Sequence, residues 1–274
     1  MPQPFDQLPQ SVLRLSRLER VGANVPALIV HPHWDAAQQR ATASAPVLVW
    51  MHGRTVNKEL DSGRYLRLAR AGIASCALDL PGHGERADLN LQGPASAMRV
   101  IEQMVRELDA VADDLAARDE FAGQRMALGG MSAGGMAALV RLTRAHRFDA
   151  ALVESATGNF HEHGLRGLAD PELIARMDPV RNLDGWRDIP LLGLHSKLDE
   201  WVPIEGQRTF FRAVRERSGR PDLVVLHEFE RTGAPYEHSG FGRESAAAKE
   251  LGTQFLAVHL HAAAPQPGES GERL

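Results

Sequence analysis

The chain has 274 residues, and its 31 lysines and arginines against 35 acidic residues give a net charge of -4. This charge gives no electrostatic reason to expect nucleic acid or an anionic membrane as a partner, so we expect a small molecule. No apolar run reaches the roughly 18 residues that span a bilayer, and the amino terminus has neither a basic leader nor an apolar core, so we expect a cytoplasmic protein.

The first part of the chain shows modest strand signals at residues 12–18 and Val25–Val30. The polar stretch 35–44 is expected to be a loop. Residues 46–51 then form a continuous apolar run of strand length that ends at His52 and Gly53. Such a run suits a strand that is buried on both faces of a parallel sheet.

Strands and helices alternate from there on. Further strands are predicted at 73–78, 125–129, 150–153, 190–194 and 223–226. Helices are predicted at 57–71, 94–117, 133–145, Ile204–Arg217 and Ser245–His261. This alternation predicts an α/β fold with parallel strands joined by right-handed helical crossovers. The single cysteine, Cys76, lies in one of these strands and excludes an intramolecular disulfide.

Domain organisation is expected to be simple. We predict one α/β domain over residues 1–261, because no internal linker divides it. Within it, segment 155–188 has no clear periodicity. The tail 262–274 is rich in Ala, Pro, Gly and Glu, which predicts disorder.

The sequence GMSAG at residues 130–134 lies between a predicted strand and a predicted helix. In that context the pattern G-x-S-x-G predicts a tight turn that exposes the hydroxyl of Ser132 as a nucleophile. The backbone N–H of Ala133, which opens the next helix, is placed to stabilise an oxyanion. On its own the pentapeptide is also compatible with a glycine-rich turn that merely joins strand to helix.

A serine nucleophile needs a base, and the base needs an acid that orients its ring. Asp199 follows a predicted strand, in the loop at its carboxyl end, where sites in open α/β sheets lie. His238 lies in the loop before the last helix. The order Ser132, Asp199, His238, with each residue after a separate strand, predicts a catalytic triad.

A second oxyanion donor is expected from the loop after the first buried strand, and the backbone amide of Arg54 is our candidate. The Arg54 side chain is open to two interpretations, a solvated loop residue or a partner for an acidic group of the substrate. His52 is expected to be structural, with its ring packing or hydrogen-bonding beneath this loop.

With these residues the sequence resembles the α/β-hydrolase superfamily, in its bacterial esterase, dienelactone-hydrolase-like or prolyl-oligopeptidase-like branch. The resembling segments are MHGRTVNKE (51–59), LDLPGHGER (78–86), the Ser132 turn, the Asp199 loop and His238. They span residues 47 to about 255. The resemblance implies a mostly parallel eight-stranded sheet with helices on both faces, acyl-enzyme chemistry, and no metal or organic cofactor. It does not imply a substrate.

Several neighbouring residues allow a second interpretation. His83 is expected to belong to a structural turn rather than to the chemistry, and Glu154 is an alternative acid for the triad. By analogy with α/β hydrolases, segment 155–188 is expected to form a small cap, with Phe160, Leu165, Leu168 and Leu173 as its apolar underside. His161 and His163 have no third clustered ligand and are expected to be loop residues rather than metal ligands.

These observations predict a serine hydrolase that cleaves carboxylic esters of small molecules. A serine peptidase acting on small peptides is the first alternative. An acyltransferase would use the same residues, and a ligand-binding module with vestigial hydrolysis is a further alternative of another class. The sequence does not indicate the oligomeric state or the acyl and leaving groups.

Overall fold

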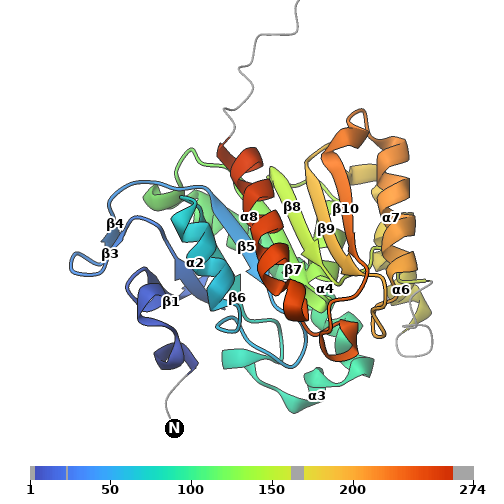
Figure 1. The fold of residues 1–274 in the computed structure, drawn as a ribbon, viewed down its shortest axis with the longest axis horizontal. Coiled ribbons are helices and arrows are strands. Elements are labelled where there is room, and N and C mark those ends of the chain that lie inside the picture. The colour runs from blue at the N-terminus through green and yellow to red at the C-terminus, as the bar shows by residue number, and fades with distance from the viewer. Residues whose placement is uncertain (1–3, 23, 162–169, 262–274) are drawn as a thin grey trace, which may run out of the picture.

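The computed structural model describes residues 4–22, 24–161 and 170–261 (Figure 1). An eight-stranded sheet, ordered β1-β2-β6-β5-β7-β8-β9-β10, forms its centre. Its strands are β1 (Ser16–Val21), β2 (Val25–Val30), β5 (Val47–Met51), β6 (Ala74–Leu78), β7 (Met126–Met131), β8 (Ala150–Glu154), β9 (Leu191–Ser196) and β10 (Val224–Phe229). Only β2 runs antiparallel to its neighbours, and the pairs from β6 to β10 are parallel. This confirms the predicted mostly parallel sheet.

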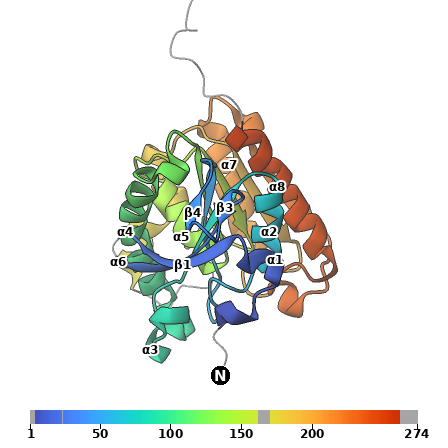
Figure 2. The ribbon, with the colours of Figure 1, turned by 90° about the vertical axis from the view of Figure 1, so that its left-hand side faces the viewer.

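Helices cover both faces of the sheet, as Figure 2 shows with α4 and α8 on opposite sides. One face carries α1 (Gln10–Leu13), α2 (Ser62–Arg70) and α8 (Ser245–His261), and the other carries α4 (Ala97–Ala116), α5 (Ala133–Leu142) and α7 (Ile204–Arg217). Two short helices, α3 (Leu89–Gln92) and α6 (Pro171–Met177), lie in connecting segments.

The strand β5 explains why the core has two halves. Val47, Val49 and Met51 are buried in the apolar cluster of α4, α5 and α7, whereas Leu48 and Trp50 are buried in the cluster of α2 and α8. Successive side chains of a strand point to opposite faces, so a strand covered on both sides must be apolar throughout. The continuous run 46–51 therefore correctly predicted a central strand.

Three details of the local structure differ from the expectations. Val12 lies in the short helix α1, not in a strand, and β1 begins only at Ser16, because the buried contacts of Val12 on the α2 face outweigh its β preference. The stretch 35–44 contains part of a two-stranded sheet, β3 (Trp34–Asp35) and β4 (Arg40–Ala41). Helix α2 begins at Ser62, five residues later than predicted.

Segment 155–188 is only partly described. Phe160, expected under a cap, is buried in the core with Ile174 and Met177 of α6, and Leu173 packs against the same cluster. Leu165 and Leu168 lie outside the described residues, as do His163 and the tail 262–274. The small cap and the disordered tail stay predictions.

Candidate active site

Ser132 sits in a strained turn between β7 and α5. Its backbone has φ 51° and ψ −119°, a region that costs free energy for a residue with a side chain. Two hydrogen bonds hold it there. The Ser132 amide donates to the Glu154 carbonyl at 2.8 Å, and the Ser132 carbonyl accepts from the Met136 amide at 2.8 Å.

The two glycines of the motif allow this turn to pack against the end of β5. A Cβ atom on Gly130 would lie 2.6 Å from the Met51 carbonyl oxygen, and one on Gly134 would lie 2.6 Å from the His52 carbonyl oxygen. Both distances are too short for a real Cβ contact. The turn therefore needs glycine at both positions for close packing.

The structure brings Ser132, His238 and Asp199 into one hydrogen-bonded chain. His238 Nε2 lies 3.0 Å from Ser132 Oγ. On the other side of the ring, His238 Nδ1 lies 2.8 Å and 3.0 Å from the two carboxylate oxygens of Asp199. His238 is 4% and Asp199 6% exposed, so these interactions are shielded from bulk water. This arrangement has the geometry of a nucleophile, a base and an orienting acid.

The Asp199 carboxylate is held in its ionised form. Its Oδ1 accepts hydrogen bonds from the backbone amides of Trp201 at 3.0 Å and Val202 at 2.8 Å. Burial acts to raise the pKa of Asp199, but hydrogen bonds from His195 and His238 outweigh it and lower this pKa below its ordinary value. Asp199 is therefore suited to stabilise a positive charge on the His238 ring.

The loop after β5 lies directly beside Ser132. A Cβ atom on Gly53 would be 3.5 Å from Ser132 Cβ. Arg54, the next residue, lines the same pocket, and Ala133 is the first residue of α5, where the N–H lacks a partner within the helix. The two candidate oxyanion donors thus belong to two separate elements near Ser132.

His52 and His83 take part in structural hydrogen bonds near this loop. The buried His52 ring donates from Nδ1 to the Gly53 carbonyl at 2.6 Å and accepts from the Leu80 amide at Nε2, 3.1 Å away. His83 Nδ1 contacts the Pro81 carbonyl oxygen at 2.8 Å, and His83 is not among the residues that line the pocket. The rings support the loops, as expected for both residues.

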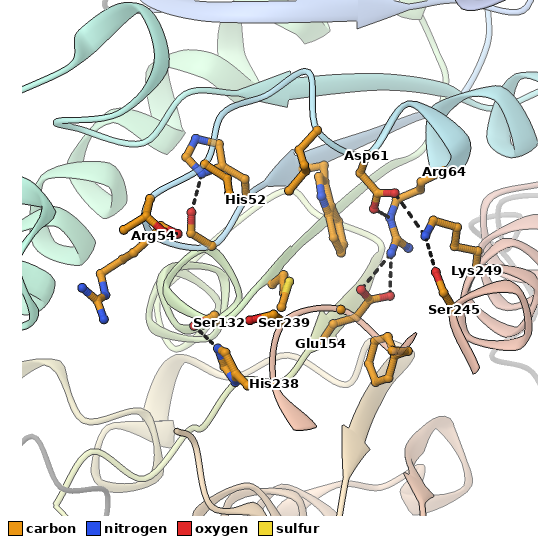
Figure 3. A pocket seen from close by; sticks show the side chains of 18 of the residues that line it. His52, Arg54, Asp61, Arg64, Ser132, Glu154, His238, Ser239, Ser245 and Lys249 are labelled. Carbon is orange, nitrogen blue, oxygen red and sulfur yellow. Dashed lines mark hydrogen bonds and ion pairs between the residues drawn. The ribbon is translucent and has the colours of Figure 1, made fainter. Parts of the chain in front are cut away.

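A cavity of about 390 Å³ extends from Ser132 and His238 toward a group of charged side chains between α2 and α8 (Figure 3). Arg64 Nη2 contacts both carboxylate oxygens of Glu154 at 2.8 Å. Arg64 Nε donates to Asp61 at 2.7 Å, and Lys249 Nζ lies 3.4 Å from Asp61 and 2.8 Å from Ser245 Oγ. We call Asp61, Arg64, Glu154 and Lys249 the ion-pair group.

The two candidate acids face different partners. The Glu154 carboxylate faces Arg64, whereas the His238 ring faces Asp199. Sequence reasoning did not identify Asp61, Arg64 or Lys249 as residues of the site. An acid and a base three positions apart at 61 and 64 were visible in the sequence, but nothing in the sequence showed that Glu154 and Lys249 would meet them.

The described part of the chain shows no helix that is long and apolar enough to cross a membrane. Within the same residues, no group of three or more His, Cys, Asp or Glu side chains is arranged to hold a metal ion. His163, one half of the histidine pair considered above, lies outside the described ranges.

The chain is similar in sequence to known proteins. A family model described as serine aminopeptidase, S33, matches residues 42–170. Esterase YjfP of Escherichia coli (strain K12) is 26% identical over 224 residues, which cover 74% of this chain and 86% of that protein.

Solved structures also resemble this one. TT1662 from Thermus thermophilus has a TM-score of 0.69 and 24% identity, over 90% of this chain and 99% of that chain. A puromycin-hydrolyzing peptidase of Mycobacterium tuberculosis has a TM-score of 0.71 and 18% identity, and covers 92% of this chain but 40% of its own. Both similarities show a shared fold.

Proposed function

We propose that the chain is a serine hydrolase of the α/β-hydrolase superfamily that cleaves carboxylic esters of small molecules through an acyl-enzyme on Ser132. The observation that carries this proposal is the hydrogen-bonded chain from Ser132 Oγ through His238 to Asp199. Ser132 and His238 line a cavity of about 390 Å³, which is within the usual size range of small-molecule sites.

In the proposed first step, Ser132 Oγ attacks the ester carbonyl while His238 Nε2 takes the hydroxyl proton. Asp199 stabilises the imidazolium that forms. The backbone amides of Arg54 and Ala133 donate hydrogen bonds to the oxyanion of the tetrahedral intermediate. Collapse of this intermediate expels the alcohol, which receives the proton from His238, and leaves the acyl group on Ser132.

In the second step, water replaces the alcohol. His238 takes a proton from the water as its oxygen attacks the acyl carbon, and the same two amides stabilise the second oxyanion. Release of the acid returns the proton to Ser132. The side chains of the proposed triad and these amides supply every proton transfer and charge stabilisation in this cycle, and we propose no cofactor.

A peptidase acting on small peptides is the second candidate, supported by the matching family model and by the peptidase among the similar structures. We place ester cleavage first because the Escherichia coli protein that matches this chain over most of its own length is named an esterase. The cytoplasmic location and the absence of nucleic-acid and membrane partners stay predictions.

The test is the hydrolysis of p-nitrophenyl esters from acetate to decanoate by wild type and by Ser132→Ala. We expect turnover by the wild type and a loss of at least about 10⁴-fold in kcat for the variant. Cleavage of peptide amides without cleavage of activated esters would instead favour the peptidase. Ligand binding unaffected by Ser132→Ala, with no turnover of any ester or amide, would favour a binding module.

A further inference from the structure

The charged residues that line the cavity are not balanced. Among the described lining residues, three are cations and two are carboxylates: Arg54, Arg64 and Lys249, and Asp61 and Glu154. Both carboxylates are engaged within the ion-pair group, by Arg64 and Lys249. Arg54 is therefore the lining cation that has no carboxylate partner in the described part of the chain.

The guanidinium of Arg54 is partly buried, and its hydrogen-bond partner is a neutral group. Its Nη1 donates to the Gln92 carbonyl oxygen, at the end of α3, at 3.0 Å. Burial lowers the pKa of the Arg54 guanidinium, but an arginine keeps its charge in proteins. Since a guanidinium carries five N–H donors, most of its hydrogen-bonding capacity remains available to a ligand.

The backbone around Arg54 is held in an unusual conformation. The next residue, Thr55, has φ 66°, which is a rare value for a β-branched residue. The Thr55 hydroxyl donates to the Arg54 carbonyl oxygen at 2.7 Å. This bond restrains the loop backbone at Arg54, and the bond to Gln92 restrains the guanidinium.

Figure 3 shows that Arg54 and the ion-pair group lie on opposite sides of Ser132. A substrate bound at Ser132 would therefore lie between the ion-pair group on one side and, on the other, a cation that has no carboxylate partner among the described residues. Burial of a cation without a partner costs free energy, and an anionic group of a ligand removes that cost while it gains charge-assisted hydrogen bonds.

We propose that Arg54 is a specificity-determining residue that binds a carboxylate of the substrate, so that the preferred esters are those that carry a free carboxylate group. This inference rests on the proposed esterase function and names its substrate class. The planar fork of a guanidinium matches the two oxygens of a carboxylate. Arg64 does not serve this role, because its charge is already paired with the carboxylates of Glu154 and Asp61.

The test compares esters that differ only in a carboxylate or a neutral carboxamide. One pair carries this group on the leaving alcohol, p-acetoxybenzoate and p-acetoxybenzamide. The other pair carries it on the acyl chain, the p-nitrophenyl monoester of adipate and the matching ester of its monoamide. The measured quantity is kcat/KM for the anionic ester divided by kcat/KM for the neutral ester. A substitution that slows the cleavage of both esters equally leaves this ratio unchanged.

We expect wild type to prefer the anionic ester in at least one pair, and Arg54→Gln to reduce that preference by about tenfold or more. Arg54→Lys should retain part of it, since it keeps the charge but loses the fork. Arg106→Gln is the charge-matched control, because Arg106 is exposed on α4, on the other face of the sheet. The proposal would be overturned if wild type preferred the neutral ester in both pairs. It would also be overturned if the preference for the anionic ester were the same in Arg54→Gln as in wild type.

A binding measurement separates this proposal from the esterase proposal. Calorimetric titration of Ser132→Ala with p-hydroxybenzoate and with adipate is expected to show binding that weakens by about tenfold or more in Ser132→Ala/Arg54→Gln. If wild type cleaves neutral esters but neither acid binds through Arg54, only the substrate class is wrong. If wild type cleaves no ester, the esterase function itself fails, whatever the acids do.

Discussion

Two consecutive residues before His238 adopt left-handed backbone conformations, Tyr236 with φ 56° and Glu237 with φ 50°. Each costs free energy for a residue other than glycine, and neighbouring contacts offset that cost. The Tyr236 carbonyl accepts from the Glu200 amide at 3.1 Å, and its ring stacks on Trp201 at a centroid distance of 4.9 Å. These contacts tie the loop of His238 to the loop of Asp199.

Glu237 anchors the same loop through its carboxylate. This carboxylate accepts hydrogen bonds from the amide and hydroxyl of Thr232, the amide of Gly233 and the hydroxyl of Ser196, at 2.7 to 2.9 Å. Burial opposes ionisation, but these donors outweigh it and lower the pKa of Glu237 to about 2. Glu237 is a positioning residue for His238.

We expect Glu237→Gln to lower the free energy of unfolding by about 1 kcal/mol near neutral pH, because hydrogen bonds to a charged acceptor are lost. A depressed pKa in the folded state stabilises the fold above the ordinary value of 4.5, and this contribution is lost as the pH falls toward about 2. The difference in unfolding free energy between wild type and Glu237→Gln should therefore shrink as the pH falls. Urea unfolding at a series of pH values measures it, and a constant difference would contradict the assignment.

The sequence was informative about Ser132, Asp199 and His238 because each follows a separate strand of an alternating α/β pattern. It could not indicate the anchoring role of Glu237 or the free donors of Arg54. Both depend on loop conformations at Thr55, Tyr236 and Glu237 that no short-range propensity predicts.

At the level of elements, the turn between β7 and α5 is fixed by its contact with the end of β5. We expect Gly134→Ala to cost about 1–3 kcal/mol of unfolding free energy, because its methyl group would overlap the carbonyl oxygens of Met51 and His52. Gly93→Ala is the control, since no heavy atom of the described residues beyond Gly93 and its two chain neighbours lies within 4 Å of a Cβ at that position. Chemical denaturation measures the unfolding free energy of both variants. Equal values would show that the turn moves to make room for the methyl group at residue 134 without cost.

Helix α2 is joined to β8 through the buried pair of Arg64 and Glu154, which are both 3% exposed. Burial alone would lower the pKa of Arg64, but the carboxylates of Glu154 and Asp61 raise it above its ordinary value. The carbonyl oxygen of Glu154 also holds the amide of Ser132. The pair therefore connects the packing of α2 to the position of the proposed nucleophile.

We expect Arg64→Met to cost about 3–5 kcal/mol of unfolding free energy, because it leaves the buried Glu154 carboxylate without its main partner. Arg67→Met on the same helix is the matched control. Arg67 is partly exposed, and among the described residues its side chain reaches only the Gly63 carbonyl, at 3.5 Å. Urea unfolding compares the two, and a similar small loss in both would mean that Glu154 is neutralised or hydrated without cost.

Long elements with a clear pattern were predictable, and short ones were not. Helices α7 and α8 begin and end where the sequence predicted, because their apolar positions recur with helical spacing over several turns. Val12 and the β3–β4 hairpin were missed. The hairpin turn depends on a left-handed Gln39 and on the Asp35 carboxylate, which accepts from the Ala37 and Gln38 amides.

At the scale of the whole molecule, the strand order places the functional residues together. The sheet brings the carboxyl ends of β5, β7, β8 and β9 side by side. The loop of Gly53, Ser132 and the loop of Asp199 follow the ends of β5, β7 and β9, and Glu154 is the last residue of β8. The sequence predicted this edge of a parallel sheet as the site. The sequence could not predict which charged side chains line the cavity, because α2, β8 and α8 contribute Arg64, Glu154 and Lys249, which are far apart in the sequence.

Covalent labelling measures whether Ser132 is a nucleophile that His238 activates. Wild type and His238→Ala would be treated with a fluorophosphonate, and the adduct located by mass spectrometry of the intact and digested protein. We expect one adduct per wild-type chain, on Ser132, and strongly reduced labelling of His238→Ala, because the hydroxyl then lacks its base. A wild-type protein that hydrolyses esters while Ser132 stays unlabelled would contradict the account.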